Sequence, residues 1–196
     1  MQYVPPLFRP PSEANAFILQ ATLGCSWNNC TYCHMYRSKS FTIRPVPESI
    51  ADIQEAVTAA GPRIRKVFVA DGDALIMPVE TWLPLLAACK AGMANLKRVS
   101  CYATADNVVL KGLDALRTLR DAGLSRIYIG PESGDEATLR RLAKGPRLNE
   151  DRDTNYLFDR HAQAAQMARQ AGIEVSAIFL LGAGGVARSA EHAHAS

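Results

Sequence analysis

Short apolar runs alternate with longer amphipathic stretches along most of the chain. Residues 66–70 (KVFVA) form a continuous apolar run, which is typical of a strand that is covered on both faces. Four further runs have the length and the side-chain types of strands. The five predicted strands are residues 16–23, 66–70, 98–103, 126–130 and 173–181.

The amphipathic stretches between these runs predict helices. Pro47 suits the first position of one helix, and Gly61 followed by Pro62 ends it. Thr81 is expected to cap the next helix, because Pro84 is tolerated only in a first turn. The predicted helices are residues 47–60, 81–91, 111–122, 135–143 and 155–171, and a glycine follows the third and the fifth.

Five consecutive strand–helix units predict an α/β fold with a parallel sheet and right-handed crossovers. The pattern fits a doubly wound open sheet and an arc of a (β/α) barrel equally well. A complete eight-stranded barrel takes about 250 residues, more than the 196 of this chain. A six-stranded partial barrel is closer, with about five of its six units present. Residues 190–196 resemble the start of a helix after the fifth strand, so we expect a C-terminal truncation.

Composition and charge are those of an ordinary globular domain. The chain is 48% hydrophobic and 21% charged, and its formal net charge of +3 is too small to favour nucleic acid or an anionic membrane as the main partner. No apolar run reaches the roughly 20 residues that span a bilayer. We expect a proline-rich leader over residues 1–15, one domain over residues 16–196, and a cytoplasmic location in which cysteines stay reduced.

The strongest chemical signal is the segment 24–37, GCSWNNCTYCHMYR. Four residues separate Cys25 from Cys30 and two separate Cys30 from Cys33, so three thiolates can converge on one inorganic centre. Iron–sulfur clusters favour thiolate ligands. Three ligands leave one iron of a four-iron cluster open to chemistry, by the logic that separates catalytic from structural zinc sites.

Two other interpretations of these cysteines stay open. A non-catalytic iron–sulfur electron-transfer protein would usually have a fourth cysteine ligand, and none is placed for it. A zinc-stapled binding module would also need a fourth ligand, and His34 is poorly placed for that role because it is adjacent to Cys33. Cys89 and Cys101 have apolar neighbours, and we expect both to be small core residues.

The order of residues in this loop resembles the signature of the radical S-adenosylmethionine (radical SAM) superfamily. In that signature three close cysteines follow the first strand, and an aromatic residue precedes the last of them. The common form has three residues in the first gap, whereas the Cys-x4-Cys-x2-Cys spacing found here resembles an uncharacterised branch. The resemblance implies a partial (β/α) TIM-like barrel, with residues 16–196 as its core domain.

The same resemblance implies two cofactors and an activity. A [4Fe–4S] cluster is expected on Cys25, Cys30 and Cys33, with S-adenosyl-L-methionine bound to its open iron. Reductive cleavage of S-adenosylmethionine would give a 5′-deoxyadenosyl radical that abstracts hydrogen from an unknown substrate. The implied partners are that substrate and an external one-electron reductant of the flavodoxin or ferredoxin type. From charge and hydropathy, no membrane partner is expected and nucleic acid is not favoured.

The resemblance also implies residues that bind S-adenosylmethionine. Tyr32, inside the last cysteine pair, is expected against the adenine. Asp71-Gly72-Asp73 stands where the superfamily usually has Gly-Gly-Glu, the segment that holds the amino group of the methionine moiety. Glycine there permits close backbone approach, and a carboxylate suits an ammonium group. A simple turn after the strand is the alternative for this segment.

Two later strand ends complete the implied cofactor site. Residues 130–134 (GPESG) resemble a superfamily segment in which Glu132 or Ser133 touches the ribose or the methionine end of the cofactor. Leu181 and Gly182 lie in a segment that resembles the one packed against the adenine. Capping of the next helix by Ser133 or Asp135 is the alternative for the first segment.

The basic cluster and His34 can each be interpreted in two ways. The basic cluster after the fourth strand can be a solvated helix face or a contact for an anion or a substrate. His34 can be a hydrogen-bond donor near a cluster sulfide or a solvent-exposed side chain. The basic cluster consists of Arg140, Arg141, Lys144 and Arg147.

Overall fold

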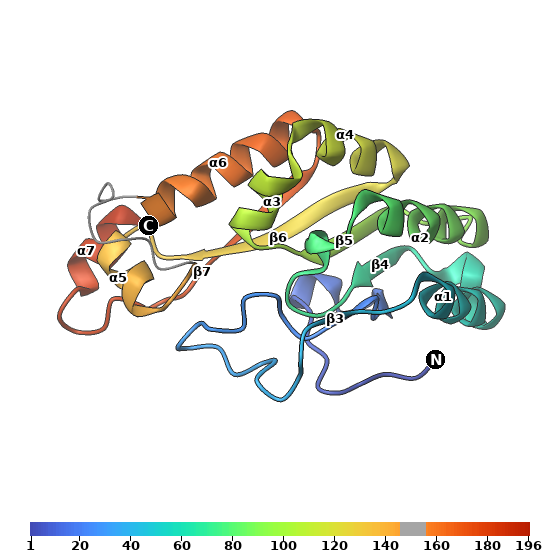
Figure 1. Ribbon diagram of the computed structural model, residues 1–196, viewed down its shortest axis with the longest axis horizontal. Helices are drawn as coiled ribbons and strands as arrows, with labels where there is room; N and C mark the ends of the chain where they lie inside the picture. The colour runs from blue at the N-terminus through green and yellow to red at the C-terminus, as the bar shows by residue number, and fades with distance from the viewer. Residues whose placement is uncertain (146–155) are drawn as a thin grey trace.

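The computed structural model describes residues 1–145 and 156–196 (Figure 1). Its main sheet has five strands, which are β1 (Phe17–Leu19), β4 (Lys66–Val69), β5 (Arg98–Tyr102), β6 (Leu124–Glu132) and β7 (Glu174–Phe179). A separate antiparallel pair consists of β2 (Thr22–Leu23) and β3 (Thr42–Ile43). The α-helices are α1 (Val46–Ala60), α2 (Val79–Gly92), α3 (Ala105–Lys111), α4 (Leu113–Ala122), α5 (Glu136–Arg141), α6 (Tyr156–Gln170) and α7 (Ser189–Ala195).

The strand order decides between the two architectures that the sequence left open. The order is β1-β4-β5-β6-β7, and every neighbouring pair is parallel. Strands therefore follow one another across the sheet in chain order, with no reversal of the kind that defines a doubly wound sheet. The prediction of a partial (β/α) barrel with parallel strands is confirmed.

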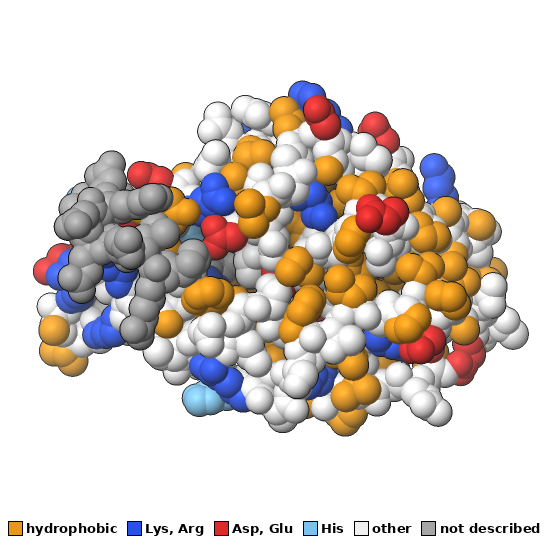
Figure 2. Space-filling view, viewed as in Figure 1, with side chains coloured by type: hydrophobic (Ala, Val, Ile, Leu, Met, Phe, Trp, Pro, Cys, Tyr) orange, Lys and Arg blue, Asp and Glu red, His pale blue; other side chains and the backbone are white. Residues whose placement is uncertain are grey.

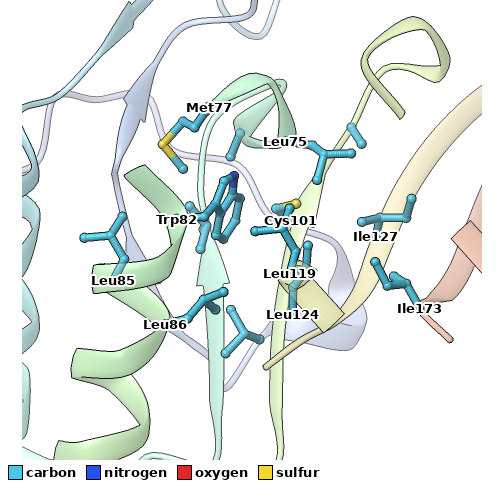
Figure 3. Packing of buried hydrophobic residues seen from close by; sticks show 14 of the residues in the cluster. Leu75, Met77, Trp82, Leu85, Leu86, Cys101, Leu119, Leu124, Ile127 and Ile173 are labelled. Atoms are coloured by element: carbon cyan, nitrogen blue, oxygen red, sulfur yellow. The ribbon is translucent and has the colours of Figure 1, made fainter. Parts of the chain in front are cut away.

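The two faces of the sheet have different partners. Val67 and Val69 belong to the main apolar core, which the helices complete, whereas Phe68 and Ala70 belong to a smaller cluster on the inner face. This alternation follows from the period of two along a strand. Figure 1 shows α4 and α6 on one side of the sheet and the N-terminal segment, in blue, on the other. In the core, Trp82 of α2 packs among aliphatic side chains from the strands and from α4 (Figure 3).

The first predicted strand is wrong in its extent, because the chain leaves the main sheet at Gln20. The Gln20 side chain is fully buried and pairs with the backbone of Val4, accepting from its N–H at 2.9 Å and donating to its carbonyl at 3.0 Å. Thr22 then pairs with Ile43 in the small antiparallel sheet. The chain is thereby turned from β1 into the cysteine loop.

Two predicted helices also begin or end elsewhere. Helix α2 begins at Val79 after Pro78, so Thr81 is not its cap and Pro84 lies inside the helix. The prediction of one helix over 111–122 misplaces a boundary, since α3 ends at Lys111 and α4 begins at Leu113. Gly112 separates them with φ +79°, a left-handed conformation that glycine adopts without a steric cost.

Residues 1–15 lie against the sheet in this structure. The Tyr3 hydroxyl donates to the Ile18 carbonyl at 2.8 Å, and Leu7 packs on the inner-face cluster. The short 3-10 helix η1 (Pro11–Glu13) precedes β1, and its Glu13 side chain is buried. Among the described residues, no helix combines the length and the apolar character that a membrane crossing requires.

Candidate functional site

The cysteine loop connects β2 to β3 and lies where the parallel strands end. Cys25, Cys30 and Cys33 are free thiols with intermediate exposure. Cys89 and Cys101 are buried in the apolar core, as expected from the sequence. Burial raises the pKa of the Cys89 thiol to about 12, so this thiol stays protonated and inert at neutral pH.

The three loop thiols share one electrostatic environment. Partial burial raises the pKa of Cys25 and of Cys30. The Cys30 thiolate is opposed by charge on Cys25 and Cys33 and favoured by the ammonium group of Lys144. Metal ligation needs thiolates, so loading an inorganic centre on this loop would release protons.

The three thiols can be compared with the requirements of a single metal ion and of an iron–sulfur cluster. Within residues 1–145 and 156–196, no three side chains of His, Cys, Asp or Glu lie close enough together to hold a single metal ion. A four-iron cluster keeps its thiolate ligands farther apart than a single tetrahedral ion does. The absence of such a group among the described residues therefore concerns a single ion and not a multi-iron cluster.

Arg37 organises the loop from within. Its guanidinium group donates to the carbonyls of Asn28 at 2.5 Å, Cys30 at 2.6 Å and Cys33 at 3.2 Å. Asn28 has φ +44°, and its side-chain amide donates to the Tyr36 carbonyl at 3.0 Å. One side chain thus binds three carbonyls of a short, irregular loop, of which the Cys30 carbonyl also accepts from the Cys33 N–H.

The outer part of the loop docks on the C-terminal end of α5. The Trp27 indole N–H donates to the Ala143 carbonyl at 2.7 Å. The Thr31 N–H donates to the Leu142 carbonyl at 3.0 Å, and its hydroxyl to the Arg141 carbonyl at 3.2 Å. The last carbonyls of a helix have no partner within the helix, so they are available to fix the loop.

Asp71, predicted to bind the cofactor, follows β4 and holds the start of the cysteine loop. Its carboxylate accepts from the Gly24 N–H at 2.7 Å and from the Lys39 ammonium at 2.8 Å. The Asp71 and Lys39 side chains are 0% and 4% exposed. Lys39 also donates to the Pro6 carbonyl and lies over the Tyr36 ring. This buried ion pair joins the end of β4, both ends of the loop and the N-terminal segment.

Gly72 provides the space in which Cys25 sits. A Cβ atom on Gly72 would lie 2.5 Å from the Cβ and 2.9 Å from the Sγ of Cys25. The Gly72 N–H also donates to the Gly24 carbonyl at 2.8 Å. The glycine is therefore required by the close approach of the loop itself, apart from any contact with a cofactor.

We expect Gly72→Ala to displace Cys25 and to reduce iron loading, because real Cβ atoms do not approach each other to 2.5 Å. Such overpacking typically costs about 1–3 kcal/mol. Iron content after reconstitution and the urea unfolding midpoint measure the two effects. Gly123→Ala is the control for iron loading: a Cβ atom there meets nothing within 4 Å, but φ +128° makes alanine strained, so this variant loses stability away from the loop. Equal iron content in the two variants would contradict the prediction.

Asp73 holds the other side of Cys25 and joins it to the next strand end. It accepts from the Ser26 hydroxyl at 2.5 Å, the Thr104 N–H at 3.1 Å and the Asn107 amide at 2.5 Å. Burial raises the pKa of the Asp73 carboxyl, and these hydrogen bonds oppose the rise. Both aspartates of the 71–73 segment thus have partners in this chain, and their contact with a methionine amino group stays a prediction.

Tyr32, Glu132 and Lys144 come together beside the thiols. The Tyr32 hydroxyl donates to Glu132 Oε1 at 2.7 Å, and the Lys144 ammonium lies 3.2 Å from both oxygens. Burial, followed by the charge of Glu132, raises the pKa of the Tyr32 hydroxyl. Glu132 has φ +66° at the end of β6, in a region where non-glycine residues are uncommon and often functional.

Ser133 and Asp135 are tied to α7 and α5. The Ser133 hydroxyl lies 2.8 Å from His192 Nδ1 and accepts from the Asp135 N–H at 3.0 Å. Asp135 caps α5 by accepting from the Thr138 N–H, as the alternative interpretation of this segment predicts. Two hydrogen bonds from Arg188 hold the pKa of the Asp135 carboxyl well below its usual range. The contact of Ser133 with a cofactor stays a prediction.

Leu181 and Gly182 are not brought against the cysteine loop. The Leu181 side chain is 94% exposed, and a Cβ atom on Gly182 would meet nothing within 4 Å. Their contact with an adenine stays a prediction. His34 is exposed, which agrees with the simpler of its two interpretations.

Arg140 and Arg141 of the basic cluster are exposed, as the interpretation of a solvated helix face expects. Arg140 pairs with Glu136, and Arg141 donates to the Ala183 carbonyl. Lys144 alone of the described members turns toward the thiols. The fourth member, Arg147, lies outside the described residues.

Several residues that build the site were missed from the sequence. Lys39 and Gln20 carry no local motif, and they meet Asp71 from positions 32 and 51 residues away in the chain, respectively. Arg37 stands at the end of the cysteine segment, where a basic residue beside several carbonyls is a weak signal. Only the tertiary structure distinguishes these residues from ordinary surface residues.

The sequence profile of the Radical SAM superfamily matches residues 19–193 of this chain. No curated protein matches it. Among solved structures, the fold is similar to the cobalamin-dependent S-adenosylmethionine radical enzyme OxsB, with a TM-score of 0.63 and 21% identity over 84% of this chain and 23% of that one.

Two further solved structures have the same fold. Methylornithine synthase (PylB) has a TM-score of 0.62 and 18% identity over 90% of this chain and 48% of that one. The radical S-adenosylmethionine methyltransferase TsrM from Kitasatospora setae, with cobalamin and a [4Fe–4S] cluster bound, has a TM-score of 0.59 and 15% identity over 83% and 30%. The chain spans 23% to 48% of the length of these three proteins.

Proposed function

Because the chain belongs to the Radical SAM superfamily, we propose that Cys25, Cys30 and Cys33 hold a [4Fe–4S] cluster to which S-adenosylmethionine binds. The observation that carries this proposal is the loop itself. Its three thiols are partly exposed at the carboxyl ends of the strands, whereas Cys89 and Cys101 are buried elsewhere. Thiolate ligands are those that iron–sulfur clusters require.

When bound, the reduced cluster supplies the electron that cleaves S-adenosylmethionine into methionine and a 5′-deoxyadenosyl radical, which abstracts hydrogen from a substrate. The chain would orient the cluster and S-adenosylmethionine relative to each other and exclude water from the reacting atoms. Arg37 shapes the backbone between the ligands, and Asp71 and Asp73 fix the residues on either side of Cys25. A cluster loop held at so many points keeps its ligands in place through the chemistry.

Lys144, Glu132 and Tyr32 are the residues of this site that suit the charged end of S-adenosylmethionine. Lys144 offers an ammonium group to a carboxylate, and Glu132 offers a carboxylate to an ammonium group or to hydroxyls. The Lys144–Glu132 ion pair at 3.2 Å supports this assignment. The carboxylate of a zwitterionic ligand can pair with Lys144 in place of Glu132, and its ammonium group can pair with Glu132 in place of Lys144. Tyr32 contributes a ring beside this pair, which suits an adenine or a ribose.

The remaining sequence-predicted roles are proposed with the following support. Asp71 already accepts hydrogen bonds from Gly24 and Lys39, and Asp73 accepts one from Ser26. To bind the amino group of the cofactor, either carboxylate must use a further oxygen lone pair. Ser133 is fully buried at the end of β6. Leu181 and Gly182 follow β7 at the same edge of the sheet and can close over an adenine only if this loop moves.

We propose a flavodoxin- or ferredoxin-type protein as the electron donor and an unidentified molecule as the substrate. The exposure of the cysteine loop supports the first partner, because electron transfer needs a close approach to the cluster. An electron-transfer protein and a zinc-stapled module are the competing functions, and both predict that no S-adenosylmethionine is consumed.

Anaerobic iron–sulfur reconstitution followed by reduction with dithionite and addition of S-adenosylmethionine tests the proposal. We expect 5′-deoxyadenosine and methionine to form in equal amounts, measured by liquid chromatography. A reconstituted cluster that is reduced but never yields 5′-deoxyadenosine would indicate the electron carrier. Colourless protein that takes up zinc and no iron would indicate the zinc module.

A further inference from the structure

We propose that a basic cavity at the amino ends of the strands binds a compact, multiply charged phosphate anion. The cavity has a volume of about 650 Å³, within the usual range for small-molecule sites. Lys66 and Arg98, the first residues of β4 and β5, line it together with Arg126 near the start of β6. It therefore lies at the end of the sheet opposite to the cysteine loop and is independent of the proposed radical chemistry.

The lining of this cavity is much more positively charged than the chain as a whole. Seven of its eleven lining residues are Lys or Arg, and one is acidic, whereas the complete chain has a net charge of +3. On the face shown in Figure 2, by contrast, basic and acidic side chains are scattered among each other. Like charges held around one hollow repel each other, and a bound anion would remove that repulsion.

Among residues 1–145 and 156–196, five of the seven cavity cations have no carboxylate partner. Arg98 pairs with Glu13 at 3.2 Å and Arg126 with Glu174 at 2.5 Å. Some of the others donate to backbone carbonyls, which do not neutralise a charge. The cavity cations without an ion pair in the part of the chain that the structure describes are Arg63, Arg65, Lys66, Lys97 and Arg120.

The lining favours a small phosphate compound over a larger anion. Guanidinium groups bind phosphate oxygens in a bidentate manner, and five of the lining residues are arginines. Asn15 and Ser125 add neutral polar groups. No aromatic side chain lines the cavity in the described residues, so a nucleobase would find no ring to stack on. Charge and hydrogen bonding alone would recognise the ligand, which suits pyrophosphate or a similar compact polyphosphate.

Isothermal titration calorimetry of the 196-residue chain with pyrophosphate at constant ionic strength tests this site. We expect one site per chain with a Kd at or below about 100 μM. The double variant Arg63→Gln/Arg65→Gln removes two exposed cations and should weaken binding by about tenfold or more, because each loses a charge-assisted contact. Its far-ultraviolet circular dichroism and its melting temperature without ligand should match those of the unaltered chain.

Lys90→Gln/Arg117→Gln is the matched control, because it removes the same net charge from residues that do not line the cavity. We expect its affinity for pyrophosphate to be unchanged. Absence of binding, or equal weakening in both double variants, would overturn the proposal. Sulfate binding as tightly as pyrophosphate would show that the cavity does not select a polyphosphate, and tighter binding of a single-stranded oligonucleotide would assign it to nucleic acid instead.

Discussion

Cys30→Ala is expected to abolish iron–sulfur loading and with it all formation of 5′-deoxyadenosine. Reconstituted unaltered chain should contain about four iron atoms and four sulfides, with the broad visible absorption of a cluster. Cys30 stands between the other two ligands in the sequence, and its thiol is electrostatically coupled to both. Two remaining thiolates cannot hold three irons of a cubane, so we expect iron content near zero in this variant.

Cys89→Ala is the matched control for this loss. Cys89 is 1% exposed in the core and lies on α2, so the variant removes one thiol without removing a ligand. We expect full iron content and unchanged 5′-deoxyadenosine formation, with a loss of stability of roughly 1 kcal/mol. If Cys89→Ala lost the cluster while Cys30→Ala retained it, the assignment of the ligands would be wrong.

Lys39→Met is expected to give the largest loss of folding stability among single substitutions near the site. It leaves the Asp71 carboxylate, which is 0% exposed, without its cationic partner. Removing one partner of a buried ion pair typically costs roughly 3–5 kcal/mol, because the remaining charge is no longer compensated. Methionine keeps most of the packing against Tyr36, so the loss reports on charge. Urea unfolding, monitored by circular dichroism, measures it.

Two comparisons isolate the contribution of the buried charge. In Lys39→Met/Asp71→Asn both charges are absent, and we expect this double variant to recover part of the stability that Lys39→Met loses. In Arg117→Met the broken pair with Asp114 is at the surface, with side chains 55% and 97% exposed, and we expect a change of no more than about 0.5 kcal/mol. A similar loss in Lys39→Met and Arg117→Met would contradict the role of the buried pair.

The ligand loop and the strand–helix alternation could be predicted from the sequence, because both depend on local order. Three cysteines within nine positions identify an inorganic site whatever the surrounding fold. Apolar runs of five to nine residues identify strands, and the glycines after two of the helices mark their ends. Two of the boundaries that were wrong, at Gln20 and Gly112, are places where a side-chain contact or a left-handed residue interrupts a continuous pattern.

The support around the cysteine loop required the tertiary structure. Asp71 and Asp73 could be predicted to matter, but their partners Lys39, Thr104 and Asn107 come from segments more than thirty positions away. The same holds for the pairing of Lys144 and Glu132 with Tyr32, which lies 112 and 100 positions from them. Residue order does not record which distant segments meet in space, so no pattern along the chain could identify these pairings.

The sequence by itself determined the fold class, the superfamily resemblance and the three thiols, since periodicity and close spacing are properties of the chain. Only the tertiary structure decided that the sheet is the arc of a barrel, because the order of neighbouring strands depends on how crossovers wind. It also decided that seven cations meet in one cavity. They come from the starts of three strands, from the segments just before two of them and from the last turn of α4. A parallel sheet brings the starts of its strands to one edge.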